Sequence, residues 1–77
     1  DASSAAYIQK FHQLESWREN LVDGHSAALS EVLDTFPNTD RQQLRHLVRK
    51  ARDERETGQQ TTHFRRLFQF LKALAEE

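Results

Sequence analysis

Four arginines in the second half of the chain recur at a spacing that suits the binding of anions. The intervals are four, four and three residues, for Arg41, Arg45, Arg49 and Arg52. On an α-helix this spacing confines them to an arc of about 80°, over about 16 Å of helix length. Guanidinium donors match the oxygens of phosphate and are less tightly hydrated than ammonium groups. The pattern predicts an arginine ridge, made of these four residues, that contacts phosphate.

A second cationic ridge is predicted further along the chain. Arg65 and Lys72 fall at about 100° and 80° from Phe64 on a helical wheel, beside an apolar stripe. The two ridges can line one groove and bind RNA together. The alternative is a solvated helix face with intrahelical pairs, such as Arg52 with Glu56, or a face that docks on a protein.

The net charge of −1 conceals an uneven distribution of charge. Residues 1–40 carry two basic and seven acidic side chains, whereas residues 41–75 carry nine basic and three acidic ones. A cationic half on a nearly neutral protein indicates an acidic partner, such as nucleic acid, an acidic protein or an anionic membrane. The alternative is a pair of complementary surfaces that neutralise each other within the fold or across an oligomer.

Patterns for catalysis and metal binding are weak or absent in the sequence. His12 and Glu15 have a spacing that can share a metal ion, but no second pair at ligand spacing accompanies them. There is no glycine-rich phosphate loop, no nucleophile elbow and no cysteine. We therefore expect no enzymatic activity, no metal, no cofactor and no small-molecule substrate.

Two glycines and one proline divide the chain into four segments with helical periodicity. We expect helices over about residues 4–23, 26–35 and 40–55 and from about residue 61 to 75, with Asn38 or Thr39 as the N-cap of the third. Residues 53–61 are interpreted as a frayed helix end and a flexible linker. Because no segment alternates at period two, the predicted fold is all-α, an antiparallel bundle of three main helices plus one short connecting helix.

Apolar stripes on the four segments give the predicted core. It comprises Tyr7, Phe11, Leu14 and Leu21 on the first, Ala28, Leu29, Val32, Leu33 and Phe36 on the second, Leu44, Leu47, Val48 and Ala51 on the third, and Phe64, Leu67, Phe68, Leu71, Leu74 and Ala75 on the fourth. Trp17 lies at the margin of the first stripe, where it could instead stack on RNA bases. Arg18 lies within that stripe, and we expect it to form a structural ion pair, with Asp34 or Asp40, or to meet a helix C-terminus.

The second and third segments also permit a DNA-binding reading. A short turn around Pro37 followed by a basic helix is compatible with a helix-turn-helix that places the third helix in a DNA groove. Base-reading amides on that helix are limited to Gln42 and Gln43. This makes the helix-turn-helix a weaker alternative than RNA contact.

From Phe11 onward, the chain resembles the C-terminal domain of the bacterial YjgA family, also called DarP. The residues that carry the resemblance are Phe11-His12, Leu14-Glu15, Arg18, Leu21-Val22-Asp23, Glu31-Val32-Leu33, Asp40-Arg41-Gln42-Gln43-Leu44-Arg45, Leu47-Val48-Arg49, Phe68-Gln69-Phe70-Leu71 and Leu74-Ala75-Glu76. The hexad that begins at Asp40, after the pair Phe36-Pro37, is the most specific of them. The resemblance covers about 65 of the 77 residues.

The resemblance implies an all-helical, ribosome-associated protein of about twice this length without enzymatic activity. The resemblance also implies binding to late precursors of the large ribosomal subunit near the peptidyl-transferase region, which helps ribosomal RNA to mature. Arg41, Arg45 and Arg49 match family positions, which implies that the arginine ridge contacts ribosomal RNA.

Together these observations predict one helical-bundle domain, residues 1–77, that forms the C-terminal half of a longer protein. We expect it to be a cytoplasmic monomer that binds ribosomal RNA in the large-subunit precursor through Arg41, Arg45, Arg49, Arg52, Arg65 and Lys72. No signal peptide or membrane-spanning stretch is recognisable, and the lack of cysteine fits a reducing compartment. The main rival is a protein-interaction module that binds an acidic partner or a second copy of itself.

Overall fold

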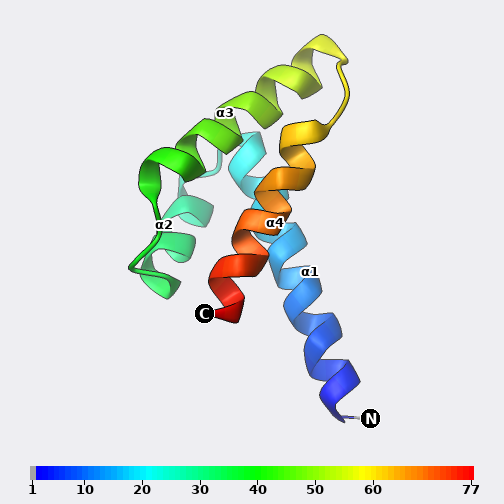
Figure 1. Cartoon of the computed structure of the whole chain (residues 1–77), viewed down its shortest axis with the longest axis vertical. Helices are drawn as coiled ribbons and strands as arrows, with labels where there is room; N and C mark the ends of the chain where they lie inside the picture. The colour runs from blue at the N-terminus through cyan, green and yellow to red at the C-terminus, as the bar shows by residue number, and fades with distance from the viewer. Residues whose placement is uncertain (1) are drawn as a thin grey trace.

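The computed structural model describes residues 2–77, with side chains from Ser4 onward, and these residues form four α-helices. The helices are α1 (Ala2–Asp23), α2 (Ser26–Thr35), α3 (Arg41–Thr57) and α4 (Thr62–Glu76). Figure 1 shows them joined by short connections, without a strand in the described part of the chain. The predicted all-α bundle of three main helices and one short connecting helix is confirmed.

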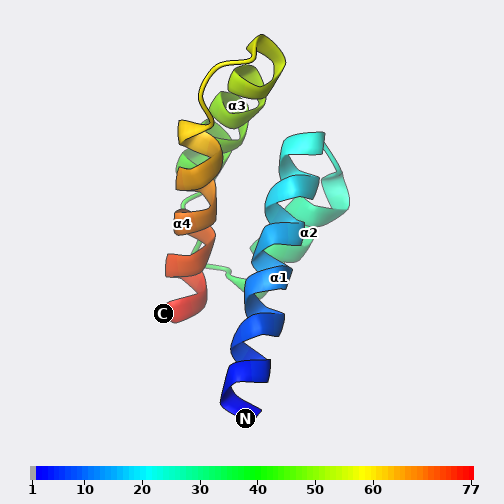
Figure 2. The ribbon, with the colours of Figure 1, turned by 90° about the vertical axis from the view of Figure 1, so that its right-hand side faces the viewer.

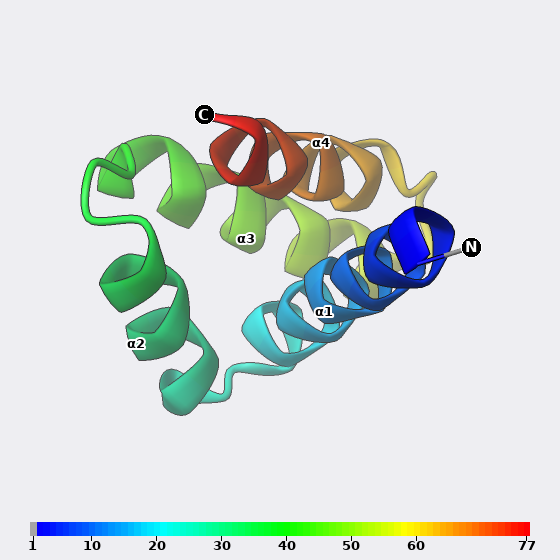
Figure 3. The same cartoon turned by 90° about the horizontal axis from the view of Figure 1, so that it is seen from below.

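The helices form two layers. α3 and α4 run antiparallel as one hairpin, and α1 and α2 form the other layer (Figure 2). α1 contacts every other helix, whereas no Cα atom of α2 lies within 8 Å of a Cα atom of α3 or α4. Figure 3, seen from below, shows α2 standing apart from the α3–α4 hairpin. Among the helices, α2 therefore packs most closely on α1, and its buried residues Ala28 and Val32 join the common core.

A continuous apolar core lies between the layers. Its buried members are Leu14, Trp17, Leu21, Val22, Ala28, Val32, Leu44, Leu47, Ala51, Leu67, Phe68, Leu71 and Leu74. The stripes predicted on α3 and α4 are confirmed, although Val48, Phe64 and Ala75 are only partly buried. The periodicity of apolar residues thus located the inner faces of these two helices.

The predicted core was wrong at the N-terminal end of α1. Tyr7 is 61% exposed and Phe11 is 41% exposed, although the Phe11 ring still lies 5.1 Å from that of Phe68. α1 extends past the end of α4 (Figure 1), and Tyr7 and Phe11 line an open hollow between the two helices near that end. Leu29 was also predicted in the core, and it is 40% exposed because it faces the space between α2 and α3.

Trp17 connects α1 with α2. Its side chain is buried, its Nε1 donates a hydrogen bond to Glu31 Oε2 at 2.8 Å, and its ring meets the Phe36 ring edge-on at 5.8 Å. A buried indole cannot stack on RNA bases, so Trp17 is a structural residue.

The predicted ion pair of Arg18 was wrong. Among the described residues, Arg18 makes no ion pair within 4 Å, and its guanidinium carbon lies 3.9 Å from the ring centre of Phe64 and 5.1 Å from that of Phe68. Burial lowers the pKa of Arg18, and the charges of Glu15 and Glu19 act in the opposite direction. The cation is held over aromatic faces, whose negative quadrupole attracts it.

Asp40 and Gly58 define the two ends of α3. The N-cap is Asp40, whose carboxylate accepts a hydrogen bond from the Gln43 backbone N–H at 3.1 Å, and not the predicted Asn38 or Thr39. An aspartate directly before the first helical residue is well placed to reach an unpaired amide of the first turn. At the other end, Gly58 adopts a left-handed conformation with φ of 71° and terminates the helix.

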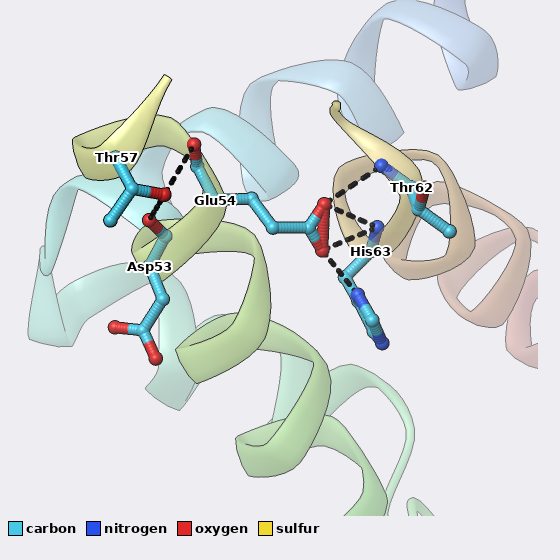
Figure 4. Close-up of polar contacts among 5 residues, drawn as sticks. All are labelled: Asp53, Glu54, Thr57, Thr62 and His63. Atoms are coloured by element: carbon cyan, nitrogen blue, oxygen red, sulfur yellow. Dashed lines mark hydrogen bonds and ion pairs between the residues drawn. The ribbon is translucent and has the colours of Figure 1, made fainter. Parts of the chain in front are cut away.

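The connection between α3 and α4 is ordered by Glu54 and is not the frayed segment that the sequence predicted. The Glu54 carboxylate is buried and accepts hydrogen bonds from the backbone N–H groups of Thr62 and His63 and contacts His63 Nδ1 (Figure 4). It thereby satisfies free amides at the N-terminus of α4 from a neighbouring helix. α3 itself runs without a break to Thr57, and residues 58–61 form the connection to α4.

Because of Glu54, we expect the free energy of unfolding to decrease at acidic pH. Burial by itself raises the pKa of Glu54, but the hydrogen bonds from His63 and Thr62 outweigh it and hold the pKa below the usual range. A lowered folded-state pKa stabilises the fold above the usual titration range of glutamate, and this contribution is lost as the pH falls through the folded-state value.

The measurement is the urea midpoint of unfolding, followed from neutral pH to about pH 3. Glu54→Gln, which cannot ionise, should show a smaller decrease towards low pH than the unsubstituted chain. An equal decrease in both proteins would show that other carboxyl groups account for the acid sensitivity.

Candidate functional site

The space between α2 and α3 is a groove of about 520 Å³, and all four residues of the arginine ridge line it. Arg41, Arg45, Arg49 and Arg52 form the α3 side, as the spacing in the sequence predicted. The groove exists because the backbone of α2 lies close to that of α1 and further from that of α3. We call this space the α2–α3 groove.

The α2–α3 groove has a positive charge without neutralising partners. None of its lining residues is acidic. Arg41, Arg45 and Arg49 are exposed, and none of them makes an ion pair or a side-chain hydrogen bond among the described residues. Cations that lack acidic neighbours and line a concave surface concentrate positive potential there. The groove is therefore suited to a phosphate-bearing ligand.

The floor of the α2–α3 groove is aliphatic. Leu29 and Leu33 contribute from α2, and Leu44 and Val48 contribute from α3. Leu44 is fully buried, Leu33 and Val48 are partly buried, and Leu29 is exposed. His25 and Ser26 lie at the end of the groove where α2 begins. A cationic wall thus borders an apolar surface.

Arg52 differs from the other three arginines because it binds the main chain of α1. Its Nε donates to the Val22 carbonyl oxygen at 2.9 Å and its Nη2 donates to the Leu21 carbonyl oxygen at 3.2 Å. α1 ends at Gly24, which has φ of 88°, so these carbonyls lie in its last turn, where a cation is favourable. The sequence grouped Arg52 with the ridge, and its bond to α1 could not be found from spacing along one helix.

Replacing Arg52 with alanine is expected to destabilise the fold by about 1.5–3 kcal/mol, the usual range for hydrogen bonds to charged groups. The lone Trp17, which is buried, reports on urea unfolding by its fluorescence. Arg49→Ala is the matched control, since Arg49 is exposed and unpaired, and it should change stability much less. Equal losses in the two variants would contradict the role of Arg52 in capping α1.

The second predicted ridge does not join the first. Arg65 lies beside the α3–α4 connection with Gln59 and Gln60. Lys72 lies in a separate small hollow between α1 and α4, together with Lys10. The expectation that both ridges line one groove was wrong, because α4 packs against α3 and α1 on the side away from α2.

The described residues contain no cluster of three or more histidine, aspartate or glutamate side chains that could hold a metal ion. His12 Nδ1 and Glu15 Oε1, the pair noted in the sequence, lie 3.1 Å apart on the exposed surface of α1. His63 contacts Glu54, and its ring meets that of His46 at 6.0 Å. Within the described chain, no helix is long and apolar enough to cross a membrane.

Comparison with known proteins identifies the family. Residues 1–72 match the family described as "Dual-action ribosomal maturation protein DarP". The chain belongs to the DarP family. Proteins of the same name are 44% identical to this chain over 69 residues in Photorhabdus laumondii, 46% identical over 69 residues in Edwardsiella ictaluri and 46% identical over 66 residues in Escherichia coli.

The matched region is most of this chain and a minor part of each relative. It covers 90% of the chain and 38% of the DarP protein of Photorhabdus laumondii, and 86% and 36% for that of Escherichia coli. The family resemblance that the hexad at Asp40 indicated is confirmed. The α2–α3 groove lies within the matched residues and is thus a surface of the DarP-family region itself.

Proposed function

We propose that this chain binds ribosomal RNA in the precursor of the large ribosomal subunit and assists its maturation without enzymatic activity. The single observation that supports RNA binding most strongly is the α2–α3 groove, whose lining contains four arginines and no acidic residue. Membership of a family whose name states ribosomal maturation supports the ribosomal target. In this proposal the chain acts as a monomer in the cytoplasm.

The spacing of the exposed arginines supports contact with one strand of RNA. Arg41, Arg45 and Arg49 follow one another at intervals of four residues, or about 6 Å along the helix axis. This is comparable to the separation of neighbouring phosphates along a nucleic-acid strand. Each guanidinium can therefore meet a successive phosphate, with Arg52 fixing the end of the row through its bonds to α1. In the same proposal Arg65 and Lys72 meet phosphates at separate points outside the groove.

The rival function is docking on an acidic protein surface or on a second copy of the chain. Binding to fragments of large-subunit ribosomal RNA at several salt concentrations, together with the elution volume of the free protein, separates the possibilities. We expect RNA binding that weakens steeply with salt, because phosphate contacts release counterions, and elution as a monomer. Elution as a dimer without RNA binding would overturn the proposal in favour of self-association.

A further inference from the structure

We infer that the α2–α3 groove holds an unpaired nucleotide, with the base on its aliphatic floor and the flanking phosphates on Arg41, Arg45 and Arg49. This inference rests on the proposed function, and it specifies the class of RNA that the site takes. The target is a bulge or a loop and not a continuous duplex.

The aliphatic floor is the first argument. Phosphates of a duplex face outward and need cations, but they gain nothing from an apolar surface beside those cations. The groove nevertheless presents Leu29, which is 40% exposed, beside Leu33 and Val48. An unstacked base has two apolar faces, and sequence-specific RNA recognition mostly uses such bases in loops and bulges. The floor offers a base the cover that it loses on leaving the stack.

The dimensions of the groove are the second argument. A volume of about 520 Å³ falls within the usual range of pockets for small molecules, which is about 300–1,000 Å³. A groove of this size accommodates one nucleotide. Guanidinium planes can also stack on bases, so an arginine that binds a phosphate can cover a base edge as well.

The charge of the lining is the third argument, and it favours RNA over an acidic helix of a partner protein. The cations line one wall along its length, in a row that matches one phosphodiester strand. Apart from the arginines, the side chains with polar atoms are His25 and Ser26 at one end. With so few groups able to read a base edge, we expect the site to tolerate all four bases.

The probes are three short RNA duplexes of one sequence: one with a single-nucleotide bulge, one with an abasic nucleotide at the bulge, and one fully paired. The bulged and abasic duplexes have the same charge, so they differ only in the base. We expect the bulged duplex to bind about five- to tenfold more tightly than the abasic one, which corresponds to the lower end of the range for stacking of a base on an aromatic ring, because the floor here is aliphatic. Changing the identity of the bulged base should alter affinity less than removing it.

Leu29→Gln tests the floor, and Ile8→Gln is its control. Both side chains are exposed on helices, and Ile8 is 54% exposed on α1 and does not line the groove. In Leu29→Gln the preference for the bulged over the abasic duplex should largely disappear, while the salt dependence is unchanged because the arginines remain. Ile8→Gln should keep the preference, and thermal unfolding of both variants confirms that they are folded.

Equal binding of the bulged and abasic duplexes by the unsubstituted chain would overturn this inference while leaving RNA binding in place. A preference for the bulge that survives in Leu29→Gln would likewise overturn it, since the base would then lie elsewhere. Failure to bind any of the three duplexes or ribosomal RNA would overturn the proposed function itself. Binding of the same groove to an acidic peptide instead, lost in Leu29→Gln, would assign the groove to a protein partner.

Discussion

Replacing Arg45 and Arg49 together with alanine is expected to weaken binding to many RNA sequences by a similar factor. Both side chains are exposed, line the α2–α3 groove and have no acidic partner, so they are available to phosphate. Phosphate contacts carry little sequence information, and discrimination between RNAs should hardly change. The slope of log affinity against log salt should become shallower by about 0.7–0.9 for each lost contact.

Lys50→Ala is the control for this double variant. Lys50 is an exposed cation on the same helix, but it lines a different hollow with Glu54 and His63. It should change the affinity and the salt slope much less than either arginine. If Lys50→Ala and Arg45→Ala had equal effects, binding would depend on diffuse charge and not on arginines placed along a groove.

Replacing Phe68 with alanine is expected to cost about 3–5 kcal/mol, the usual range for removing a buried aromatic ring. Phe68 is 8% exposed, lies 5.1 Å from the Phe11 ring and supports the Arg18 guanidinium at 5.1 Å. The substitution creates a cavity in the core. It also removes one of the two aromatic rings that contact the Arg18 guanidinium. Since small domains have total stabilities from about 5 kcal/mol, the variant should be largely or wholly unfolded at moderate urea.

Phe70→Ala is the matched control on the same helix. Phe70 is only partly buried and packs against the rim of the core, so its removal should cost distinctly less. Unfolding followed by circular dichroism compares the two variants. A larger loss from Phe70 than from Phe68 would mean that the core is not centred on the inner face of α4.

Much of the fold follows from helical periodicity in the sequence. The stripes that contain Leu44 and Leu67 set the facing surfaces of α3 and α4, and both residues are fully buried. The arginine ridge also follows from periodicity, because four residues at intervals of three and four on one helix share one side whatever the helix packs against. Because this prediction depends only on spacing along one helix, it did not require knowledge of the contacts between helices.

The failed predictions concern contacts between helices. Arg52 and Arg49 have similar places on the helical wheel, but only Arg52 lies where α1 ends, and the sequence does not reveal which helix terminus lies opposite. From the sequence, Glu54 was assigned to a frayed helix end. Its partners, Thr62 and His63, lie eight and nine residues further along the chain, on the next helix. Arg18 was matched with acids by charge, whereas the fold placed it against aromatic rings.

The closer packing of α2 on α1 than on α3 or α4 has a consequence for local dynamics. α2 has 10 residues, fewer than the roughly 12–15 that an isolated helix needs for appreciable stability in water, so it depends on its contacts with α1, such as the bond between Trp17 and Glu31. Its local opening should therefore require less free energy than global unfolding, and its amides should exchange with solvent before those of α3 and α4. One wall of the groove can open while the arginine wall remains in place, so a ligand held between the two walls would slow hydrogen exchange chiefly in α2.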